Sequence, residues 1–368
     1  MNVLILSVGS LLGQVMLDVL AGRRQQLELI GTNSLPEAPS NFRCDRVFLT
    51  PETTHPDFLA RFESVVEQVQ PELILPGRDD DVVFLAKYLH THPGFKPRAP
   101  VGHPDIARVC RDKWLSFRWA QERHLPFAES FWLTETTRAE LEAFIQRTGF
   151  PMIAKPRLGF GSNGVYFLQS REALETLTCS GELLLQECLG DTAHLAAYQR
   201  AYAQGMPLFF QVPQFQNHSA QLLIKPDGTT DQIFCAHNRF AVGEIVQLTP
   251  AAPPELMTTV RAFADALIQA GWRGPANIAA MPDTRGRWKV HEINLRMTGA
   301  TSLRLACGYD EMRQVFQAFS GCDLPACAAP SGPGTVHMVR QPQWVSEQAQ
   351  QTLKTQQYWF ADMQQPAN

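Results

Sequence analysis

The chain has 368 residues, of which 45% are hydrophobic and 18% charged, and its formal net charge is -4 with a pI near 6.2. This balance provides no basic surface for nucleic acid or an anionic membrane, and no apolar run approaches the roughly 20 residues that span a bilayer. The length accommodates two or three domains, each with its own core. The eight cysteines form no Cys-x-x-Cys pair, and the N-terminus reads as a strand rather than a signal peptide, so we expect reduced thiols and a cytoplasmic protein.

The first hundred residues alternate between apolar strands and amphipathic helices, which predicts a doubly wound parallel sheet. The turn at 7–13 lacks the full glycine set of a dinucleotide site, and Thr32 and Asn33 stand where an NAD site needs an acidic residue. A nicotinamide-dependent enzyme is therefore disfavoured. Arg78 and the three aspartates at 79–81 follow a strand end, where they either touch a substrate or cap the next helix. The expected strands are 3–6, 27–31 and 73–75, and the expected helices are 11–20, 57–68 and 82–89.

A proline-rich linker at 92–103 marks a domain boundary, and beyond it we expect a mixed α+β region. The expected helices there are 107–123, 138–148, 192–204 and 254–270. The expected strands are 152–154, 165–168, 183–186, 208–212, 220–224, 232–236, 275–281 and 288–294.

The segment at 151–165 reads PMIAKPRLGFGSNGV. Its short strand delivers Lys155, and a polar loop with three glycines follows. Such a loop can expose backbone N–H groups to phosphate oxygens, with the ammonium as the countercharge. The glycines also match the dinucleotide pattern G-x-G-x-x-G, but that pattern requires a helix where this chain continues as a strand. The segment therefore favours a flap over nucleotide phosphates, with an ordinary glycine-rich hairpin as the alternative.

A second candidate site lies in the segment KVHEINLR at 289–296, which overlaps the expected strand at 288–294. Strand alternation places Glu292, Asn294 and Arg296 on one face. A carboxylate and an amide oxygen are hard ligands for Mg²⁺, and the guanidinium can hold a phosphate or carboxylate with its fork of donors. The alternative is a polar outer face of a strand with one ion pair.

Together these two segments resemble the ATP-grasp superfamily, which includes the carbamoyl-phosphate synthase large chain, biotin carboxylase and many carboxylate–amine ligases. The resemblance extends from the N-terminal unit to about Gly321, and its most specific matches are KPRLGFGSNGV and HEINLRMTGAT. It implies an α/β and α+β fold: a doubly wound pre-ATP-grasp domain over 1–103, a small ATP-grasp lobe with the glycine flap over 104–182, and a large lobe with a C-terminal tail over 183–368.

The resemblance also implies roles for individual residues. Two lysines would bind ATP phosphates, the glycine loop would close over them, and the strand Glu-Ile-Asn would ligate Mg²⁺ or Mn²⁺. The ATP-binding residues that it implies are Lys113, Lys155, Gly161, Ser162, Gly164, Gln186, Glu187, Cys188 and His218, the metal ligands are Glu292 and Asn294, and the catalytic residues are Lys155, Arg239 and Arg296.

The adenine hinge has two candidates. The strand LLLQECLG at 183–190 matches the family pattern, so the backbone of Gln186 and Cys188 would read the adenine edge, and we prefer this segment. The alternative is the segment at 207–228, which contains Gln211. His218 stands where the family has an acidic ribose contact, and it is either a general base, like His237, or a hydrogen-bonded structural residue.

One metal ligand of the family is missing. Ala279 stands where the penultimate strand normally carries Gln or Glu, with Asp283 as a candidate substitute. Because Mg²⁺ readily keeps several waters, this loss weakens a metal site without abolishing it.

The resemblance implies an ATP-dependent ligase that activates a carboxylate as an acyl phosphate and joins it to an amine. The alternative is a non-catalytic ATP-binding module of the same fold. We expect small-molecule substrates, with the acceptor pocket around Arg78 and Ser302, and no nucleic acid or membrane partner. The identity of the substrates is open, and so is the oligomeric state, with a homodimer as one option.

Overall fold

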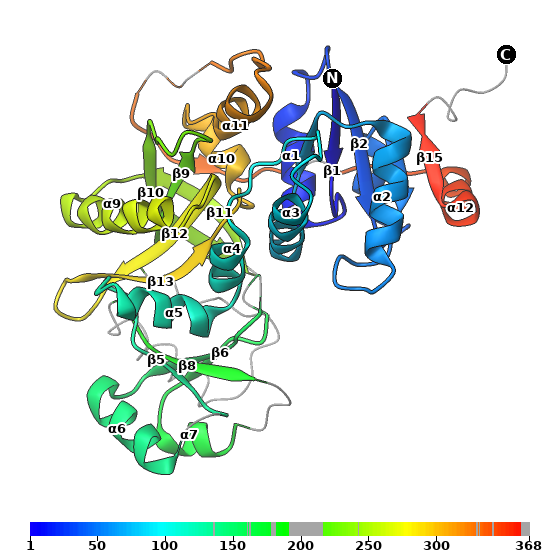
Figure 1. The fold of residues 1–368 in the computed structure, drawn as a ribbon. Helices are drawn as coiled ribbons and strands as arrows, with labels where there is room; N and C mark the ends of the chain where they lie inside the picture. The colour runs from blue at the N-terminus through cyan, green and yellow to red at the C-terminus, as the bar shows by residue number, and fades with distance from the viewer. Residues whose placement is uncertain are drawn as a thin grey trace, which may run out of the picture.

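Three β-sheets organise the computed structural model of the chain (Figure 1). The structure describes residues 1–134, 137–159, 161, 163–177, 182–190, 216–241, 243–328, 330, 332–340 and 342–361. The expected helix at 192–204, the expected strand at 208–212, Ser162 and Gln211 lie outside the described residues. The α/β and α+β fold class is confirmed, while the domain boundaries at 103 and 182 stay a prediction.

The first sheet has the predicted doubly wound form. Its parallel strands are β1 (Asn2–Ile5), β2 (Glu28–Asn33), β3 (Arg46–Leu49) and β4 (Leu73–Leu75), in the order β3-β2-β1-β4. Alternate residues of these strands face opposite layers. Leu4 and Ile74 pack with the helices α2 (Phe58–Val69) and α3 (Asp79–Thr91), whereas Val3 and Leu73 pack with α1 (Leu11–Leu20). A short 3-10 helix, Pro39–Arg43, precedes β3.

The C-terminal part of the chain returns to this first sheet. Strand β15 (Tyr358–Phe360) pairs antiparallel with β3, and helix α12 (Glu347–Gln356) precedes it (Figure 1). Trp359 is buried and contacts Phe42 edge to face, with 5.2 Å between the ring centroids. The segment expected as a tail therefore covers the outer edge of the N-terminal sheet.

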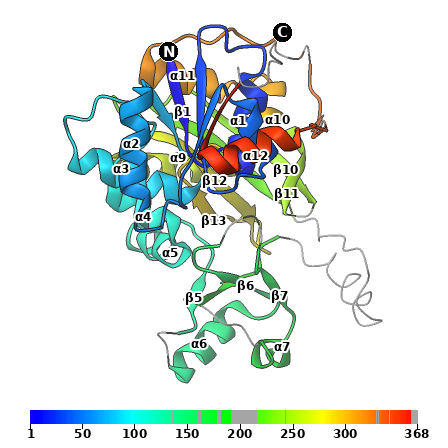
Figure 2. The same ribbon diagram turned by 90° about the vertical axis from the view of Figure 1, so that its right-hand side faces the viewer.

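The second sheet is small and antiparallel. It comprises β5 (Ser130–Trp132), β8 (Leu183–Glu187), β6 (Met152–Pro156) and β7 (Tyr166–Leu168), in that order. The helices α6 (Arg138–Thr148) and α7 (Arg171–Glu175) lie on its outer side, below the rest of the molecule in Figure 2.

The third sheet is the largest. Its strand order is β13 (Trp288–Asn294), β12 (Gly274–Pro282), β9 (His218–Ile224), β10 (Ile233–Ala241), β11 (Glu244–Pro250) and β14 (Val336–His337). Helix α9 (Pro254–Gln269) packs on one face, where Leu222 and Ile278 are buried. The other face is covered at one end by α10 (Thr301–Ala306) and α11 (Glu311–Ser320), and its other end faces the small sheet.

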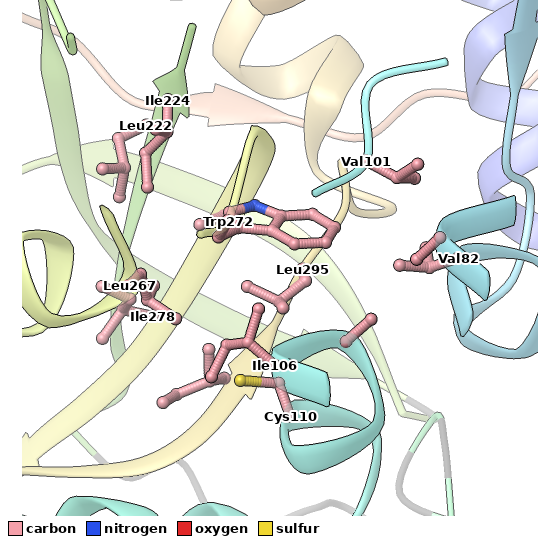
Figure 3. Close-up of a cluster of buried hydrophobic side chains, with 14 of the residues drawn as sticks. Val82, Val101, Ile106, Cys110, Leu222, Ile224, Leu267, Trp272, Ile278 and Leu295 are labelled. Carbon is pink, nitrogen blue, oxygen red and sulfur yellow. The ribbon is translucent and has the colours of Figure 1, made fainter. Parts of the chain in front are cut away.

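One continuous core joins the N-terminal unit to the third sheet. Trp272 is fully buried at its centre, with Val82 and Val101 on one side and Leu222 and Ile278 on the other (Figure 3). The indole N–H donates to the carbonyl of Pro275 over 3.1 Å, so the polar atom of this buried ring is satisfied. None of the described helices combines the length and the apolar surface that crossing a membrane requires.

The single helix expected over 107–123 is wrong. The structure has two helices, α4 (Pro104–Arg111) and α5 (Lys113–Glu122), because Asp112 adopts an extended conformation between them. Its carboxylate accepts hydrogen bonds from the N–H groups of Trp114 and Leu115, which is the behaviour of a helix N-cap. The break places Lys113 at the start of a helix.

A buried ion pair in the third-sheet region leads to a stability prediction. Arg304 and Glu311 are 1% and 2% exposed, and Arg304 Nε donates to Glu311 Oε1 over 3.0 Å. Glu311→Ala is expected to lower the free energy of unfolding by about 3–5 kcal/mol, because it leaves a buried guanidinium without its counterion. The control is Asp323→Ala, which removes the exposed partner of Arg313 on the same helix and should cost less than about 1 kcal/mol. Urea denaturation measures both, and equal losses would contradict the prediction.

Candidate active site

A cavity of about 410 Å³ lies between the small sheet and the end of the third sheet that faces it. Its size is within the range of small-molecule sites. One part of its wall is apolar, with Ile153, Phe167, Leu189 and Met281, and another part is charged. The predicted residues that line it are Lys113, Lys155, Gly161, Gln186, Glu187, Cys188 and Glu292.

Lys155 comes from β6 and is 6% exposed. Its ammonium donates to Gln186 Oε1 over 2.8 Å and to the carbonyl of His291 over 3.2 Å. Burial lowers the pKa of this lysine to about 8, although the Glu292 carboxylate acts in the opposite direction. The side chain therefore forms a partly desolvated cation that a phosphate group would stabilise.

Lys113 approaches from the other side. Its position depends on the Asp112 cap, since Lys113 is the first residue of α5. Its ammonium donates to the carbonyl of Gly159 over 2.8 Å and lies 3.4 Å from Glu292 Oε1. The cap thus directs a second cation toward the glycine loop and the third sheet.

Glu292 is the anion between these two lysines. Burial opposes ionisation of its carboxyl group, but Lys113 and Lys155 outweigh that cost and hold its pKa at about 2. The carboxylate is therefore ionised at every physiological pH. A divalent cation bound here would find a charged oxygen ligand in place.

The glycine loop follows β6 directly. Gly161 and Gly164 have φ values of +57° and +70°, a region that side chains disfavour. Asn163 and Gly161 line the cavity, together with Gly159. The loop therefore lies beside both lysines, where the sequence analysis expected a flap over phosphates.

The preferred hinge segment also lines the cavity. Strand β8 ends at Glu187, so Cys188 and Leu189 lie outside the ladder at the cavity wall. The Glu187 carboxylate accepts from Lys289 over 2.5 Å and from the N–H of Glu129 over 2.7 Å, which fixes the end of the strand. The Glu187 carboxylate is thus bonded to protein groups, which is consistent with a hinge that contacts the adenine base through its backbone atoms.

Asn294 is the last residue of the strand that carries Glu292, and Arg296 lies two residues beyond its end, both outside the described lining of the cavity. Arg296 is paired with Asp79, a residue of the N-terminal unit, by two hydrogen bonds of 2.7 and 2.9 Å. The amide oxygen of Asn294 accepts a long hydrogen bond of 3.5 Å from Arg296. Burial opposes the ionisation of Asp79, but the guanidinium of Arg296 outweighs it and lowers the pKa of the carboxyl group.

The oxygen donors fit a magnesium site with few protein ligands. Ala279 lies directly opposite Glu292 in the β12–β13 ladder, so this position contributes no ligand. Asp283, the candidate substitute, accepts hydrogen bonds from the backbone of Arg285 and Arg287 in the hairpin turn and pairs with the Arg287 side chain. No group of three or more His, Cys, Asp or Glu in the described parts of the chain could hold a metal ion. Glu292 and Asn294 thus provide one carboxylate and one amide oxygen, a donor set that suits Mg²⁺ only when other oxygens complete it.

Strand register separates two other predicted residues from the cavity. His218 lies opposite Ala280, one position out of phase with Ala279 and Glu292, and so on the face that packs against α9. There it contacts Trp288 and His237, with ring centroids 4.9 and 5.1 Å away, and burial lowers its pKa. The alternative interpretation of His218 and His237, as packed structural histidines, fits this environment.

Arg239 follows His237 by two positions on β10, so it shares that face, and it is exposed. It is absent from the described lining of the cavity. Arg239 was a candidate for phosphate or acyl-phosphate contact, but the register of β10 places it on the face that His237 and His218 share.

Sequence reasoning missed two residues at the site. His291 lines the cavity, and its Nε2 is buried without a hydrogen-bond partner among the described residues. Burial and the neighbouring Lys155 lower its pKa to about 4, so the ring is neutral. Asp79 was expected, with its two neighbours, to touch a substrate or to cap a helix, but its pairing with Arg296 was missed because that partner is 217 residues away.

The low pKa of Lys155 predicts proton uptake on nucleotide binding. Phosphates favour the charged ammonium and so raise its pKa above the value of about 8 in the free protein. At about pH 9, ADP binding should take up close to one proton, whereas at about pH 6.5 this group should contribute none. Calorimetry in buffers of different ionisation enthalpy measures the uptake. Lys155→Arg should abolish it, since arginine stays charged, and equal uptake by both proteins would contradict the assignment.

Comparison with known proteins identifies the fold. Neither the family models nor the curated proteins include a match to this chain. The N5-carboxyaminoimidazole ribonucleotide synthetase of Thermus thermophilus is 18% identical, with a TM-score of 0.64 over 90% of this chain and 82% of that one. An ADP complex of an N5-carboxyaminoimidazole ribonucleotide synthetase is 14% identical, with a TM-score of 0.65 over 89% of this chain and 79% of that one.

A third solved structure has the same arrangement. It is the biotin carboxylase domain of the 2-oxoglutarate carboxylase from Hydrogenobacter thermophilus, in complex with MgADP, ADP and bicarbonate. It is 12% identical, with a TM-score of 0.61 over 86% of this chain and 69% of that one. Identities this low establish a fold and not a reaction. The chain therefore has the fold of the ATP-grasp superfamily, which its sequence motifs predicted.

Proposed function

We propose that the chain is an ATP-dependent ligase that activates a carboxylate as an acyl phosphate and joins it to an amine. The observation that carries this proposal is the convergence of Lys113, Lys155 and Glu292 with the glycine loop and the hinge on one cavity. Solved proteins of the same fold bind ADP and MgADP, which supports a nucleotide in this position.

The proposed reaction needs charge neutralisation and positioning rather than a protein nucleophile. A carboxylate oxygen of the substrate attacks the γ-phosphorus and ADP leaves, and the amine nitrogen then attacks the acyl carbon and phosphate leaves. Bound magnesium or manganese would neutralise phosphate charge, and Glu292 and Asn294 are the residues that would hold it. Lys113 and Lys155 would bind phosphate oxygens, and the glycine loop at 159–164 would exclude water from the acyl phosphate.

A non-catalytic ATP-binding module is the second candidate. The pairing of Ala279 with Glu292 favours it, because a metal ligand is missing at the centre of the site. Such a module would bind ATP through the same lysines and hinge but would not couple its hydrolysis to substrates.

The release of ADP distinguishes the two functions. The purified protein, with ATP and magnesium, would be offered a panel of amino acids and small carboxylates, each with and without free amines. A ligase releases ADP faster with one matched pair, and mass spectrometry then finds the condensed product. ATP binding without stimulation by any pair would support the module, and a failure to bind ATP would reject both functions.

A further inference from the structure

Three consecutive aspartates begin helix α3, and each has a different partner. Asp79 pairs with Arg296, whereas Asp80 pairs with Arg111 over 2.7 Å. Asp81 is fully buried and accepts from the N–H groups of Gly77 and Arg78. Asp81 therefore caps the helix, as one reading of the sequence expected. The other two aspartates connect this helix to the site.

The helix start is held firmly against the first sheet. A Cβ atom built on Gly77 would lie 2.2 Å from the carbonyl oxygen of Leu6, so only glycine allows this close approach. The hydroxyl of Ser7 donates to Asp81 over 3.1 Å. Asp79 is thus presented to the third sheet by a rigid part of the N-terminal unit.

The Asp79 carboxylate occupies one whole edge of the Arg296 guanidinium. Nε donates to Oδ1 over 2.7 Å and Nη2 donates to Oδ2 over 2.9 Å, which is the two-bond geometry that arginine uses for carboxylates and phosphates. Nη2 also faces Asn294 Oδ1 at 3.5 Å, and Nη1 donates to the carbonyl of Met297 over 3.0 Å. A guanidinium has five N–H donors. Only one, on Nη1, therefore lacks a partner among the described residues.

The surroundings of the pair are tight. The two side chains are 17% and 19% exposed. The cavity beside Asp79, lined also by Lys113, Glu292 and Asn294, has a volume of about 10 Å³, which is close to the space for a single water. A phosphate or carboxylate group does not fit between Asp79 and the guanidinium.

We infer that Asp79 is a positioning residue. It occupies the Nε and Nη2 edge of the Arg296 guanidinium and so prevents this edge from binding an anion through two hydrogen bonds. In the proposed reaction, on which this role rests, Arg296 then meets the transferred phosphate with the single remaining N–H of Nη1. The N-terminal unit thereby sets the orientation of Arg296, which lies just beyond the end of β13. Free phosphate, which has the same chemistry as the transferred group, is therefore excluded from the Nε and Nη2 edge of the Arg296 guanidinium.

Phosphate binding tests this inference without any need for nucleotide or substrate. Inorganic phosphate is titrated at constant ionic strength, and binding is followed by calorimetry and by the thermal unfolding midpoint. Asp79→Ala is expected to bind phosphate at least about 10-fold more tightly than the unmodified protein, because it removes the carboxylate and opens its space to an anion at the charged edge. Asp79→Glu keeps the carboxylate and should restore the weak binding. The double variant Asp79→Ala, Arg296→Gln should lose the gain.

The chain provides a matched control. Asp323 accepts two hydrogen bonds of the same lengths, 2.7 and 2.9 Å, from Arg313. Arg313 belongs to helix α11, and neither residue lines the cavity. Asp323→Ala should leave phosphate affinity unchanged.

Two results would overturn the inference. One is a phosphate affinity of Asp79→Ala equal to that of the unmodified protein. The other needs no Asp79 variant and so survives a failure of that variant to fold: a crystal structure of the unmodified protein soaked in phosphate that shows the anion bonded to both Nε and Nη2 of Arg296 in place of Asp79. ADP titration of the unmodified protein runs in parallel, so that a failure of the proposed nucleotide site is recognised separately.

Discussion

Lys155→Met is expected to lower ATP turnover by about 10²–10³-fold, because it removes a preorganised cation from the phosphates in a partly desolvated site. The affinity for ADP should fall by about 10-fold or more, since a buried hydrogen bond to a charged group contributes roughly 1.5–3 kcal/mol. Methionine keeps most of the aliphatic volume of lysine. Kinetic assay and calorimetry measure the two losses.

The same substitution should leave the free protein stable. Burial already lowers the pKa of Lys155 to about 8, which means that the fold disfavours its charge. Removing the buried charge stabilises the protein, whereas loss of the hydrogen bond to Gln186 destabilises it. Because the two effects oppose each other, we expect a free energy of unfolding within about 1 kcal/mol of the original. The control Lys225→Met breaks an exposed pair with Asp231 and should change neither ADP affinity nor turnover. Near-normal turnover by Lys155→Met would refute the phosphate-binding role.

Glu292→Gln is expected to separate nucleotide binding from turnover. The Glu292 carboxylate, with its pKa at about 2, is the charged ligand available to a divalent ion and also the partner of Lys113 at 3.4 Å. Its loss should lower magnesium-dependent turnover by about 10²–10³-fold. Binding of metal-free ADP should be unchanged or tighter, because both lysines then face the phosphates without a competing anion.

Calorimetry with and without magnesium measures this separation. Glu37→Gln is the control, since it breaks an exposed pair with Lys354 far from the cavity and should have no effect. If metal-free ADP binding and turnover fell together in Glu292→Gln, Glu292 would have a structural role in the pocket rather than a role toward the metal.

Local signals in the sequence predicted much of the fold. The helices at 11–20 and 138–148 have the expected bounds, because apolar periodicity and polar caps coincide there. The strand at 288–294 also has its expected bounds, and its alternation correctly placed Glu292 on one face with Asn294. Two motifs with chemical meaning, the glycine loop and this strand, were enough to indicate a shared cleft.

Features that depend on distant partners were not predictable. Strand β15 is an edge strand whose partner β3 is about three hundred residues earlier, and three residues carry no local signature of such pairing. Strand β11 was missed, and its pairing with β10 contains a bulge, because Arg239 pairs with Gln247 and Phe240 with Ile245. The break at Asp112 was missed because the apolar pattern continues through it, and only the hydrogen bonds of the cap reveal the extended residue.

Prediction of the site was limited in the same way, because it succeeded for local motifs and failed for contacts between distant segments. Register, which a single sequence does not contain, decides that Glu292 faces the cavity while His218 and Arg239 do not. Arg296 pairs with Asp79 only because the N-terminal unit packs against the third sheet. This packing, through Trp272 and its neighbours, is visible only in the assembled fold.

A crystal structure of the chain with magnesium and a non-hydrolysable ATP analogue tests the central claim most directly. The account predicts phosphates within hydrogen-bond distance of the ammonium groups of Lys113 and Lys155, a metal ion on Glu292, and the adenine against the backbone of Gln186 to Cys188. A nucleotide bound elsewhere, or none at saturating concentration, would contradict it.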